Sequence, residues 1–382
     1  MKLIVASIPL FFVLIGIELV AARLLERRVY HFHDSFADLS CGIVEQLLGV
    51  LVKGSLFAVY LLLYAKARLF DLPENSWVVF VVCFFAVDFL YYWFHRKSHE
   101  IGAFWAAHSV HHQSEEYNLT VALRQGAFQG FFSWAFYLPL AVLGFTPTVF
   151  ITCSALNTLY QFWIHTRLIG RLGPIEWIFN TPSHHRVHHG RNPRYIDRNH
   201  AGVFIIWDRM FGTFVPETDE PVYGVVKPIG SWNPIWANAA GWADLWPVAS
   251  RARRIRDRFR AFLAPPGWRP EDLGGPLLPP EVRRPDHEPV YRSAAPSLNG
   301  YVFLQFVLLL ILSAASLSKA AQFGKAGFIG LAVFVAMGLV ILAALLEGQP
   351  WAAKAEFVRV VLSLILLATL GPQLVALFFG HA

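Results

Sequence analysis

Cysteine is scarce in this chain, and its scarcity excludes two kinds of architecture. Among 382 residues there are only three cysteines, Cys41, Cys83 and Cys153, which lie far apart in the sequence. No two of them form a C-x2-C pair, so the sequence predicts neither a disulfide framework nor a thiolate metal site. We therefore expect any metal ion in this protein to be held by histidine.

Charged residues are also few. They make up 15% of the chain, whereas 55% of it is hydrophobic, and a soluble domain carries roughly 25% charged residues. The apolar residues occur in long runs, which predicts an integral membrane protein. The net charge of +6 is typical of cytoplasmic loops that contact anionic lipids, and we expect no nucleic-acid partner.

The long apolar runs predict an all-α protein that crosses a membrane about eight times. A spanning helix needs about 20 residues. The expected spans are 3–22, 43–64, 77–94, 127–145, 147–164, 301–317, 327–346 and 357–379. The stretch 127–164 is too long for one crossing, and Gly144 and Pro147 predict a turn that makes it a hairpin. Glu45 and Lys53 interrupt the second span, which could instead be tilted or interfacial.

The placement of lysine and arginine predicts the orientation. Lys2 precedes the first span, whereas Arg23 and Arg28 follow it. This asymmetry argues against a cleaved signal peptide and places the N-terminus outside. Alternation from there makes 95–126 and 165–300 cytoplasmic, and we expect a bacterial inner-membrane location.

Four regions follow from this pattern. Residues 1–94 are N-terminal membrane spans, and 95–250 form a histidine-rich region that contains the hairpin. Residues 251–300 are basic and rich in proline, which indicates a cytoplasmic connector along the membrane surface. Residues 301–382 are C-terminal spans, to which we assign packing or substrate access and no chemistry.

Histidine is the residue that this chain has in unusual density. Ten of the fifteen histidines lie between His95 and His189. Eight of them form an H-x3-H pair and two H-x2-H-H triplets: His95 and His99; His108, His111 and His112; His185, His188 and His189. Spacings of three and four residues place side chains on one helix face. Because the hairpin returns the chain to its starting side, all three groups are expected at the cytoplasmic membrane face.

The number of imidazoles indicates two metal ions. Neutral imidazole is the commonest metal ligand near pH 7. Eight or nine such nitrogens are too many for one tetrahedral zinc ion, but they suit two ions that keep open coordination positions. Imidazole binds iron, copper and zinc alike, so the histidines alone do not select the metal.

Other polar residues near these groups are candidates as well. His165 follows the fifth span at the same membrane face, and we expect it to be a further ligand. His184 is expected to contact a ligand rather than to be one. Asp88 lies within the third span, where a carboxylate usually has a partner; it could accept a hydrogen bond from a ligand histidine or from a nearby hydroxyl. No role is assigned to His31, His33, His200, His287 or His381.

The order of the three histidine groups on a multispan chain resembles the fatty acid hydroxylase/sterol desaturase superfamily of membrane di-iron enzymes. The resemblance covers about residues 75–230. Within the superfamily, the runs from His108 to Arg124 and from Tyr160 to Phe214 are most similar to the alkylglycerol monooxygenase branch. Substrate identity does not follow from such runs alone.

The resemblance implies roles for individual residues. The eight grouped histidines match the motif that binds two Fe ions, and His165 matches an additional histidine between the motifs. Glu100, directly after His99, matches an acidic residue linked to the use of tetrahydrobiopterin. It is therefore a candidate catalytic and cofactor-binding residue, with Asp88 as the second catalytic candidate, although glutamate is also a common surface residue at such a position.

The resemblance also implies a reaction. We expect a di-iron lipid monooxygenase, an oxidoreductase that uses O2 and a reductant to hydroxylate a lipid chain. Its partners would be the lipid substrate and an electron-donor or pterin-recycling reductase. If the attacked carbon bears an ether oxygen, the product falls apart into an aldehyde and a glycerol lipid. Phe and Trp side chains near 127–164 are expected to form the apolar walls of the site.

Two alternatives stay open. One is an enzyme of the same superfamily that hydroxylates or desaturates a sterol, a carotenoid or a fatty acyl chain. The other is a metal transporter, which would place its ligands near the membrane midplane.

Overall fold

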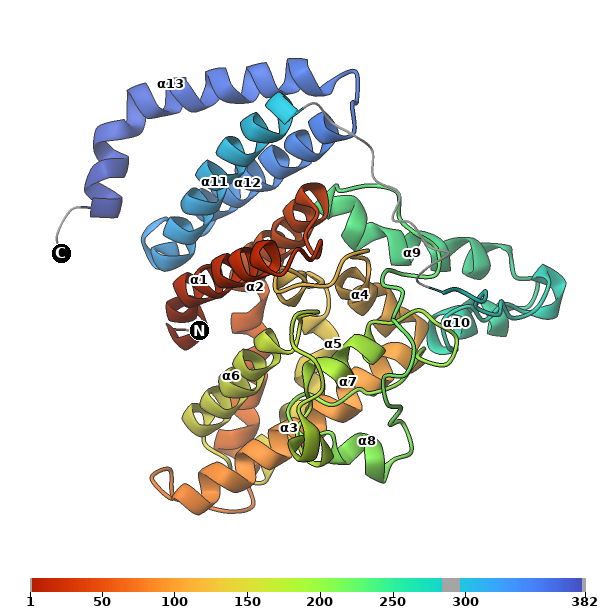
Figure 1. Ribbon diagram of the computed structural model, residues 1–382. Helices are drawn as coiled ribbons and strands as arrows, with labels where there is room; N and C mark the ends of the chain where they lie inside the picture. Colours follow the sequence, from red (N-terminus) through yellow and green to blue (C-terminus); the bar gives the residue numbers. More distant parts are fainter. Residues whose placement is uncertain (1, 284–295, 380–382) are drawn as a thin grey trace.

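Figure 1 shows the computed structural model of the chain, which describes residues 2–283 and 296–379. Within these residues every extended element is a helix, and the one β contact is an isolated antiparallel bridge between Phe179 and Phe204. The predicted all-α class is confirmed. The α-helices are α1 (Lys2–Leu24), α2 (Phe32–Ala67), α3 (Trp77–Glu100), α4 (Gly102–His112), α5 (Gly130–Val142), α6 (Pro147–Trp163), α7 (Pro182–His188), α8 (Ile206–Met210), α9 (Pro234–Arg251), α10 (Ile255–Leu263), α11 (Pro296–Ser318), α12 (Gly324–Leu346) and α13 (Ala352–Phe379). Short 3-10 turns are η1 (Val121–Leu123), η2 (Gly173–Trp177), η3 (Glu271–Leu273) and η5 (Ala320–Gln322).

Several of these helices are long and apolar enough to cross a membrane, so the chain is an integral membrane protein. The five that the described residues contain are Ser7–Leu24, Phe32–Ala67, Trp77–Glu100, Pro296–Ser318 and Gly324–Leu346. The two segments expected as a hairpin form α5 and α6, which have 13 and 17 residues. The span expected at 357–379 falls on α13, where most side chains after residue 365 lie outside the described residues.

The second helix is longer than the sequence pattern predicted. α2 begins at Phe32 instead of residue 43 and continues for 36 residues. The two charges that interrupt its apolar run pair with each other, with Lys53 Nζ 2.7 Å from Glu45 Oε1. Because the pairing offsets the cost of placing each charge in an apolar stretch, the helix continues through both residues.

The chain reverses between α5 and α6 at a tight turn. Gly144 has a positive φ of 94°, and a Cβ there would lie 1.9 Å from the carbonyl oxygen of Phe70, so only glycine fits. Thr146 then caps α6 by accepting a hydrogen bond from the Val149 backbone N–H, and Pro147 opens the helix. The turn lies where glycine and proline predicted it, and α6 returns the chain toward His165.

Close packing holds α4, the helix that carries three histidines. Its main neighbour is α9. A Cβ added to Gly241 of α9 would lie 2.7 Å from the Cα of Ala106 in α4. Glycine therefore permits a backbone-to-backbone approach that fixes the position of α4.

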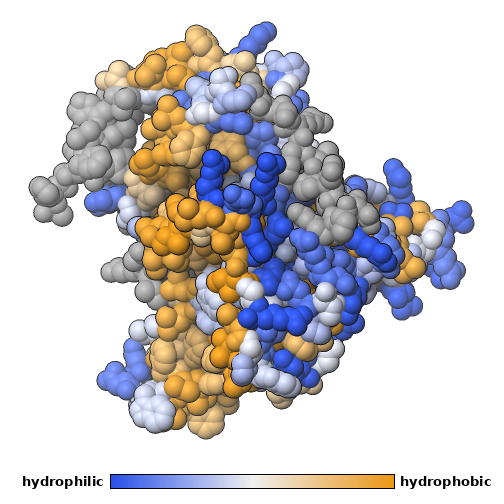
Figure 2. Space-filling model, in the orientation of Figure 1, coloured by the Kyte–Doolittle hydropathy of each residue, from blue (hydrophilic) through white to orange (hydrophobic). Residues whose placement is uncertain are grey.

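The molecule has a helical apolar region and a hydrophilic region. The C-terminal helices α11 and α12 pack on α2, where the rings of Phe36 and Phe306 lie 5.3 Å apart beside Leu339. Figure 2 shows hydrophobic residues gathered along the left side of the view, and hydrophilic residues gathered on the right, where α8, α9 and α10 lie in Figure 1.

Candidate metal centre

The expected ligand histidines come from four separate segments. α3 supplies His95 and His99 in its last two turns, and α4 supplies its triplet in its second half. His165 follows α6, and α7 with its C-cap supplies the last triplet. All nine are buried, each at most 5% exposed. The chain therefore concentrates nine imidazoles in its interior.

The nine imidazoles form two groups, within each of which the candidate ligand atoms lie within 4.8 Å of one another. The first group is His95, His99, His108, His112 and His188, and the second is His111, His165, His185 and His189. In α4, His108 and His112 are four residues apart and belong to the first group, whereas His111 belongs to the second. In the last triplet, His185 and His189 belong to the second group and His188 to the first. Because residues four apart share a helix face, each triplet bridges both groups, and the two groups form a candidate di-metal centre.

Hydrogen bonds fix which imidazole nitrogen faces inward. The Nδ1 atoms of His95, His111, His165 and His188 lie 2.7–2.9 Å from backbone carbonyl oxygens of His200, Arg124, Gln161 and Arg198. His108 Nδ1 lies 2.8 Å from the side-chain oxygen Oε1 of Gln129. A carbonyl oxygen can only accept, so each of these Nδ1 atoms carries the proton and donates it. The Nε2 atoms are therefore unprotonated.

These Nε2 atoms face one another at short range. His95 Nε2 lies 3.0 Å from His108 Nε2, and His111 Nε2 lies 3.2 Å from His165 Nε2. Neither atom of such a pair has a proton to donate, so their lone pairs repel unless a cation lies between them. Other buried Nε2 atoms, those of His99, His188 and His189, have no hydrogen-bond partner among the described residues.

Protonation does not relieve this repulsion. Burial lowers the pKa of His108 to about 3 and that of His165 to about 4. Burial and the neighbouring imidazoles hold the pKa values of the other ligand candidates outside the membrane helices well below the usual range: His111, His112, His185, His188 and His189. The residues therefore fit metal ions. For a metal–nitrogen distance of about 2.1 Å, two ligands at right angles are about 3.0 Å apart.

Asp88 is placed differently from either expectation. Its Oδ1 accepts hydrogen bonds from Asn157 Nδ2 at 2.6 Å and the Val203 backbone N–H at 2.7 Å. Its Oδ2 accepts from the Phe204 backbone N–H and from Trp207 Nε1. Two bonds on each oxygen fill a carboxylate's capacity. Asp88 therefore accepts no hydrogen bond from a ligand histidine or a hydroxyl, and both expectations are wrong. Its four bonds anchor the 203–207 segment to α3 and α6.

Glu100 and His184 lie at the edge of the centre. The Glu100 carboxylate pairs with Arg96 Nε at 2.7 Å and Lys97 Nζ at 2.6 Å, and about a third of the side chain is exposed. His184 belongs to neither imidazole group, and its ring packs against Phe214 at 5.4 Å.

His200 was assigned no role from its sequence position, yet the structure brings it beside the first group. Its ring centroid lies 5.1 Å from that of His99 and 5.6 Å from that of His188. No spacing could reveal it, because the loop that places it contains left-handed residues at Asp197 and Asn199. His200 reaches the centre through tertiary structure alone.

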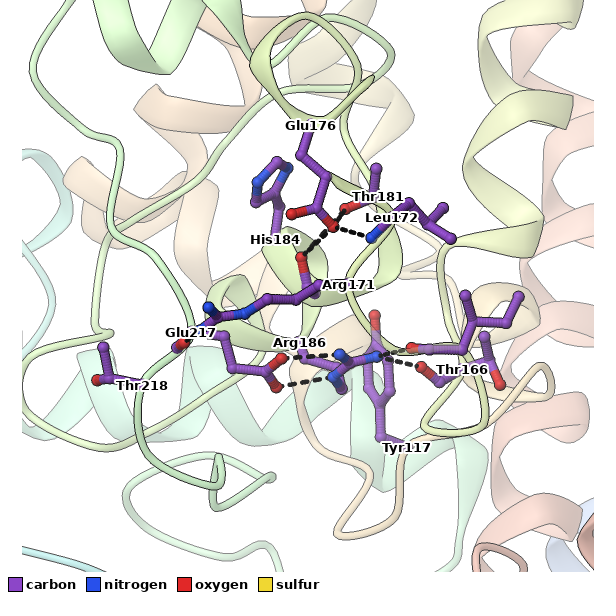
Figure 3. A network of polar contacts seen from close by, with 12 residues as sticks. Tyr117, Thr166, Arg171, Leu172, Glu176, Thr181, His184, Arg186, Glu217 and Thr218 are labelled. Carbon is purple, nitrogen blue, oxygen red and sulfur yellow. Dashed lines mark hydrogen bonds and ion pairs between the residues drawn. The ribbon is translucent and has the colours of Figure 1, made fainter. Parts of the chain in front are cut away.

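Figure 3 shows the polar contacts that hold α7. Arg186 forms two hydrogen bonds of 2.7 Å with the Glu217 carboxylate and donates to the carbonyl oxygen of Thr166, directly after His165. Glu176 accepts from the hydroxyls of Thr181 and Ser183 at the start of α7. Burial opposes ionisation of Glu176, but its hydrogen bonds outweigh burial and lower its pKa. Arg186 thus joins α7 to the loop that carries His165.

A cavity of about 250 Å³ opens onto the centre. The imidazoles of His108, His111 and His165 line one end of it. The apolar walls come mainly from α1, α2 and α11, through Ile8, Phe11, Phe12, Leu39, Ile43, Leu310, Ala314 and Leu317. Phe and Trp side chains near 127–164 were expected to form these walls. Of those in 127–164, Phe162 alone lines the cavity, beside Leu159 and three polar residues of the same stretch, so most of the apolar wall comes from other helices.

Comparison with known proteins agrees with this geometry. A family model described as fatty acid hydroxylase matches residues 80–213, which include all nine imidazoles. The alkylglycerol monooxygenase of Xenopus tropicalis is 38% identical over 358 residues, which cover 93% of this chain and 80% of that protein. The chain belongs to the fatty acid hydroxylase family. The alkylglycerol monooxygenase of Homo sapiens is 37% identical over 94% of this chain and 81% of its own length.

Other comparisons are more limited. The ornithine lipid hydroxylase of Rhizobium tropici is 30% identical over 128 residues, 33% of this chain and 39% of that protein. No solved structure matches the chain. Membership of the fatty acid hydroxylase family makes the protein an oxidoreductase of the lipid hydroxylase type, and it decides against the metal-transporter alternative.

Proposed function

We propose that this protein is a membrane di-iron monooxygenase that hydroxylates the ether-bearing carbon of an alkylglycerol and thereby cleaves the ether bond. The observation that carries the proposal is a centre of nine buried imidazoles, three of which, those of His108, His111 and His165, line a largely apolar cavity walled mainly by α1, α2 and α11. The similarity to alkylglycerol monooxygenases over most of both chains supports the choice of substrate.

The nine imidazoles are the proposed ligands of the two irons, five for one ion and four for the other. Bound iron supplies the reductive activation of O2 that attack on an unactivated C–H bond requires. In the overall reaction one oxygen atom enters the C–H bond and the other becomes water, with two electrons and two protons from the reductant. The resulting hemiacetal falls apart into a fatty aldehyde and a glycerol lipid.

The protein's own contribution is position and exclusion of water. The carbonyl oxygens and Gln129 that accept from the Nδ1 atoms hold each imidazole in one orientation. The apolar walls from α1, α2 and α11 surround an alkyl chain and keep water away from the reacting carbon. Asp88 would act as a positioning residue, through the segment that it anchors.

We further propose eight spans, a bacterial inner membrane and a cytoplasmic catalytic face. The basic residues Arg23 and Arg28 after α1 support this orientation. The 251–300 segment, of which 284–295 lie outside the described residues, would then be the cytoplasmic connector between the histidine region and the C-terminal spans.

The proposed electron source is a tetrahydrobiopterin recycled by a reductase, with Glu100 as the residue that binds it. Glu100 directly follows the buried His99 and is partly exposed, so a soluble cofactor can reach it. Its carboxylate pairs with Arg96 and Lys97 at the end of α3.

Membranes that contain the protein test the proposal directly. Supplied with iron, an alkylglycerol, reduced pterin and a reductase, they should release fatty aldehyde, and a His185→Ala variant should release none. A Glu100→Gln variant in the same assay should need more pterin for half-maximal rate. Hydroxylated or unsaturated lipid without aldehyde would instead move the protein to the sterol, carotenoid or acyl alternative, for which the similarity to an ornithine lipid hydroxylase is the supporting observation.

A further inference from the structure

Four glutamines line the cavity, and one of them differs from the rest. Gln46 Nε2 donates to Glu45 Oε2 at 2.6 Å, Gln125 Nε2 donates to the Ala122 carbonyl oxygen at 3.0 Å, and Gln161 Nε2 donates to Asn157 Oδ1 at 2.8 Å. For the fourth, Gln129, the described residues offer its amide nitrogen no acceptor; its amide oxygen alone is engaged.

The contact with His108 fixes which way the Gln129 amide points. His108 Nε2 lies 3.0 Å from His95 Nε2 and 3.2 Å from His112 Nε2, so this atom faces the candidate metal centre. His108 Nδ1 must then carry the proton and needs an acceptor, which is Gln129 Oε1 at 2.8 Å. The amide nitrogen of Gln129 is therefore directed away from His108.

The use of a side chain here is itself unusual within this cavity. The other two imidazoles that line it, those of His111 and His165, donate from Nδ1 to backbone carbonyl oxygens. A carbonyl oxygen would orient His108 equally well. A side-chain amide does the same and adds two N–H donors, on a residue that lines the cavity beside an imidazole of the metal centre.

We infer that Gln129 recognises the substrate, by donating a hydrogen bond from its amide nitrogen to an oxygen atom beside the carbon that reacts. This inference rests on the proposed function and names the residue that would recognise the ether oxygen next to the reacting carbon. Most of the remaining wall, such as Phe11, Ile43 and Leu310, is apolar and fits hydrocarbon. The polar side chains of Glu45, Thr158 and Ser313 also line the cavity, and each is engaged with a partner in the protein. The oxygen of an ether lipid can accept a hydrogen bond from the Gln129 amide nitrogen, whereas a hydrocarbon chain leaves that N–H donor without a partner.

The test compares two ligands that differ in one atom. The affinities of hexadecyl glyceryl ether and of the icosanediol in which a methylene group replaces the ether oxygen are measured without O2 or reductant, by thermal stabilisation of the full chain. In the native protein the ether should bind roughly 3- to 10-fold more tightly, the contribution of one hydrogen bond. In Gln129→Glu, which keeps an oxygen for His108 but has no N–H donor, the preference should fall to one or below with unchanged metal content.

Two further variants make the result specific. Gln129→Met removes donor and acceptor without adding charge, and it should also lose the preference. Gln349→Glu makes the same chemical change after α12, away from the cavity, and should keep it. Because each preference compares two ligands in one protein, general loss of stability cancels.

An unchanged preference in Gln129→Glu and Gln129→Met would overturn the inference, as would a native protein that binds both lipids equally. These outcomes differ from failure of the proposed function. That failure appears as a native protein that releases no aldehyde, whereas failure of the inference appears in a protein that still cleaves the ether.

Discussion

His108 and His165 are buried as neutral side chains, and their protonation couples the centre to pH. Burial holds the pKa of His108 at about 3 and that of His165 at about 4, whereas both are near 6.5 in an unfolded chain. Between pH 6.5 and pH 4 the unfolded chain therefore binds more protons than the folded one. Stability must fall as the pH is lowered through this range.

We therefore predict that metal-depleted protein loses roughly 1 kcal/mol per buried histidine when the pH falls from 7.5 to 5.5. The measurement is the unfolding temperature of chelator-treated protein in detergent at several pH values. Metal-loaded protein should resist the change at the upper end of the range, since bound ions compete with protons for Nε2. A flat unfolding temperature between pH 7.5 and pH 5 in the metal-depleted protein would contradict the buried, neutral assignment.

At this scale the sequence predicted the grouped histidines well and their environment poorly. Spacing of three and four residues is a local property, so it identified the triplets of α4 and α7 without tertiary information. The roles of Gln129 and His200 depend on contacts between distant segments; His95 and His200 are 105 positions apart in the sequence. Asp88 was singled out correctly as a buried carboxylate, but its partners lie in α6 and in a loop that no periodicity describes.

Helix α4 shows how one element transmits packing to the centre. Its three histidines enter both imidazole groups, so a small displacement of α4 changes both. Gly241 of α9 sets its position, because a Cβ there would lie 2.8 Å from the carbonyl oxygen of Ala106 and even closer to its Cα. Both neighbouring atoms are backbone and cannot rotate away.

We predict that Gly241→Ala lowers stability by about 1–3 kcal/mol through overpacking and reduces the metal content of the purified protein. Gly330→Ala is the matched control, because nothing lies within 4 Å of a Cβ at that position in α12 and alanine favours a helix by about 0.5–1 kcal/mol. Thermal unfolding and metal content are measured on both variants. Equal behaviour of the two would show that the α4–α9 approach does not position the ligands.

The helices themselves were largely predictable, and their ends were not. Hydropathy located α3 and α12 because a membrane-spanning run is long and uniform. The start of α2 escaped prediction because His33, Asp34 and Asp38 precede its apolar part. All three are buried in the folded chain. His33 contacts Asn299, Asp34 accepts from Ser114, and Asp38 pairs with the buried Arg124. These contacts exist only in the folded chain.

At the scale of the whole molecule, the cavity joins regions that the sequence kept apart. Leu310 and Leu317 of α11 line the same space as Phe11 of α1 and the imidazole of His108. The C-terminal spans were assigned packing or substrate access, and they do contribute cavity wall. No local pattern predicts that α1, α2 and α11 meet at the centre, because each is apolar along most of its length.

The number of metal ions per chain tests the central claim most directly. Purified native protein should contain two ions, measured by mass spectrometry of the metal against protein concentration. A His95→Ala/His188→Ala double variant removes two of the five imidazoles of the first group and should retain one ion at most, whereas His31→Ala should retain two. One ion in the native protein, or two in the double variant, would contradict a di-metal centre built from these two groups.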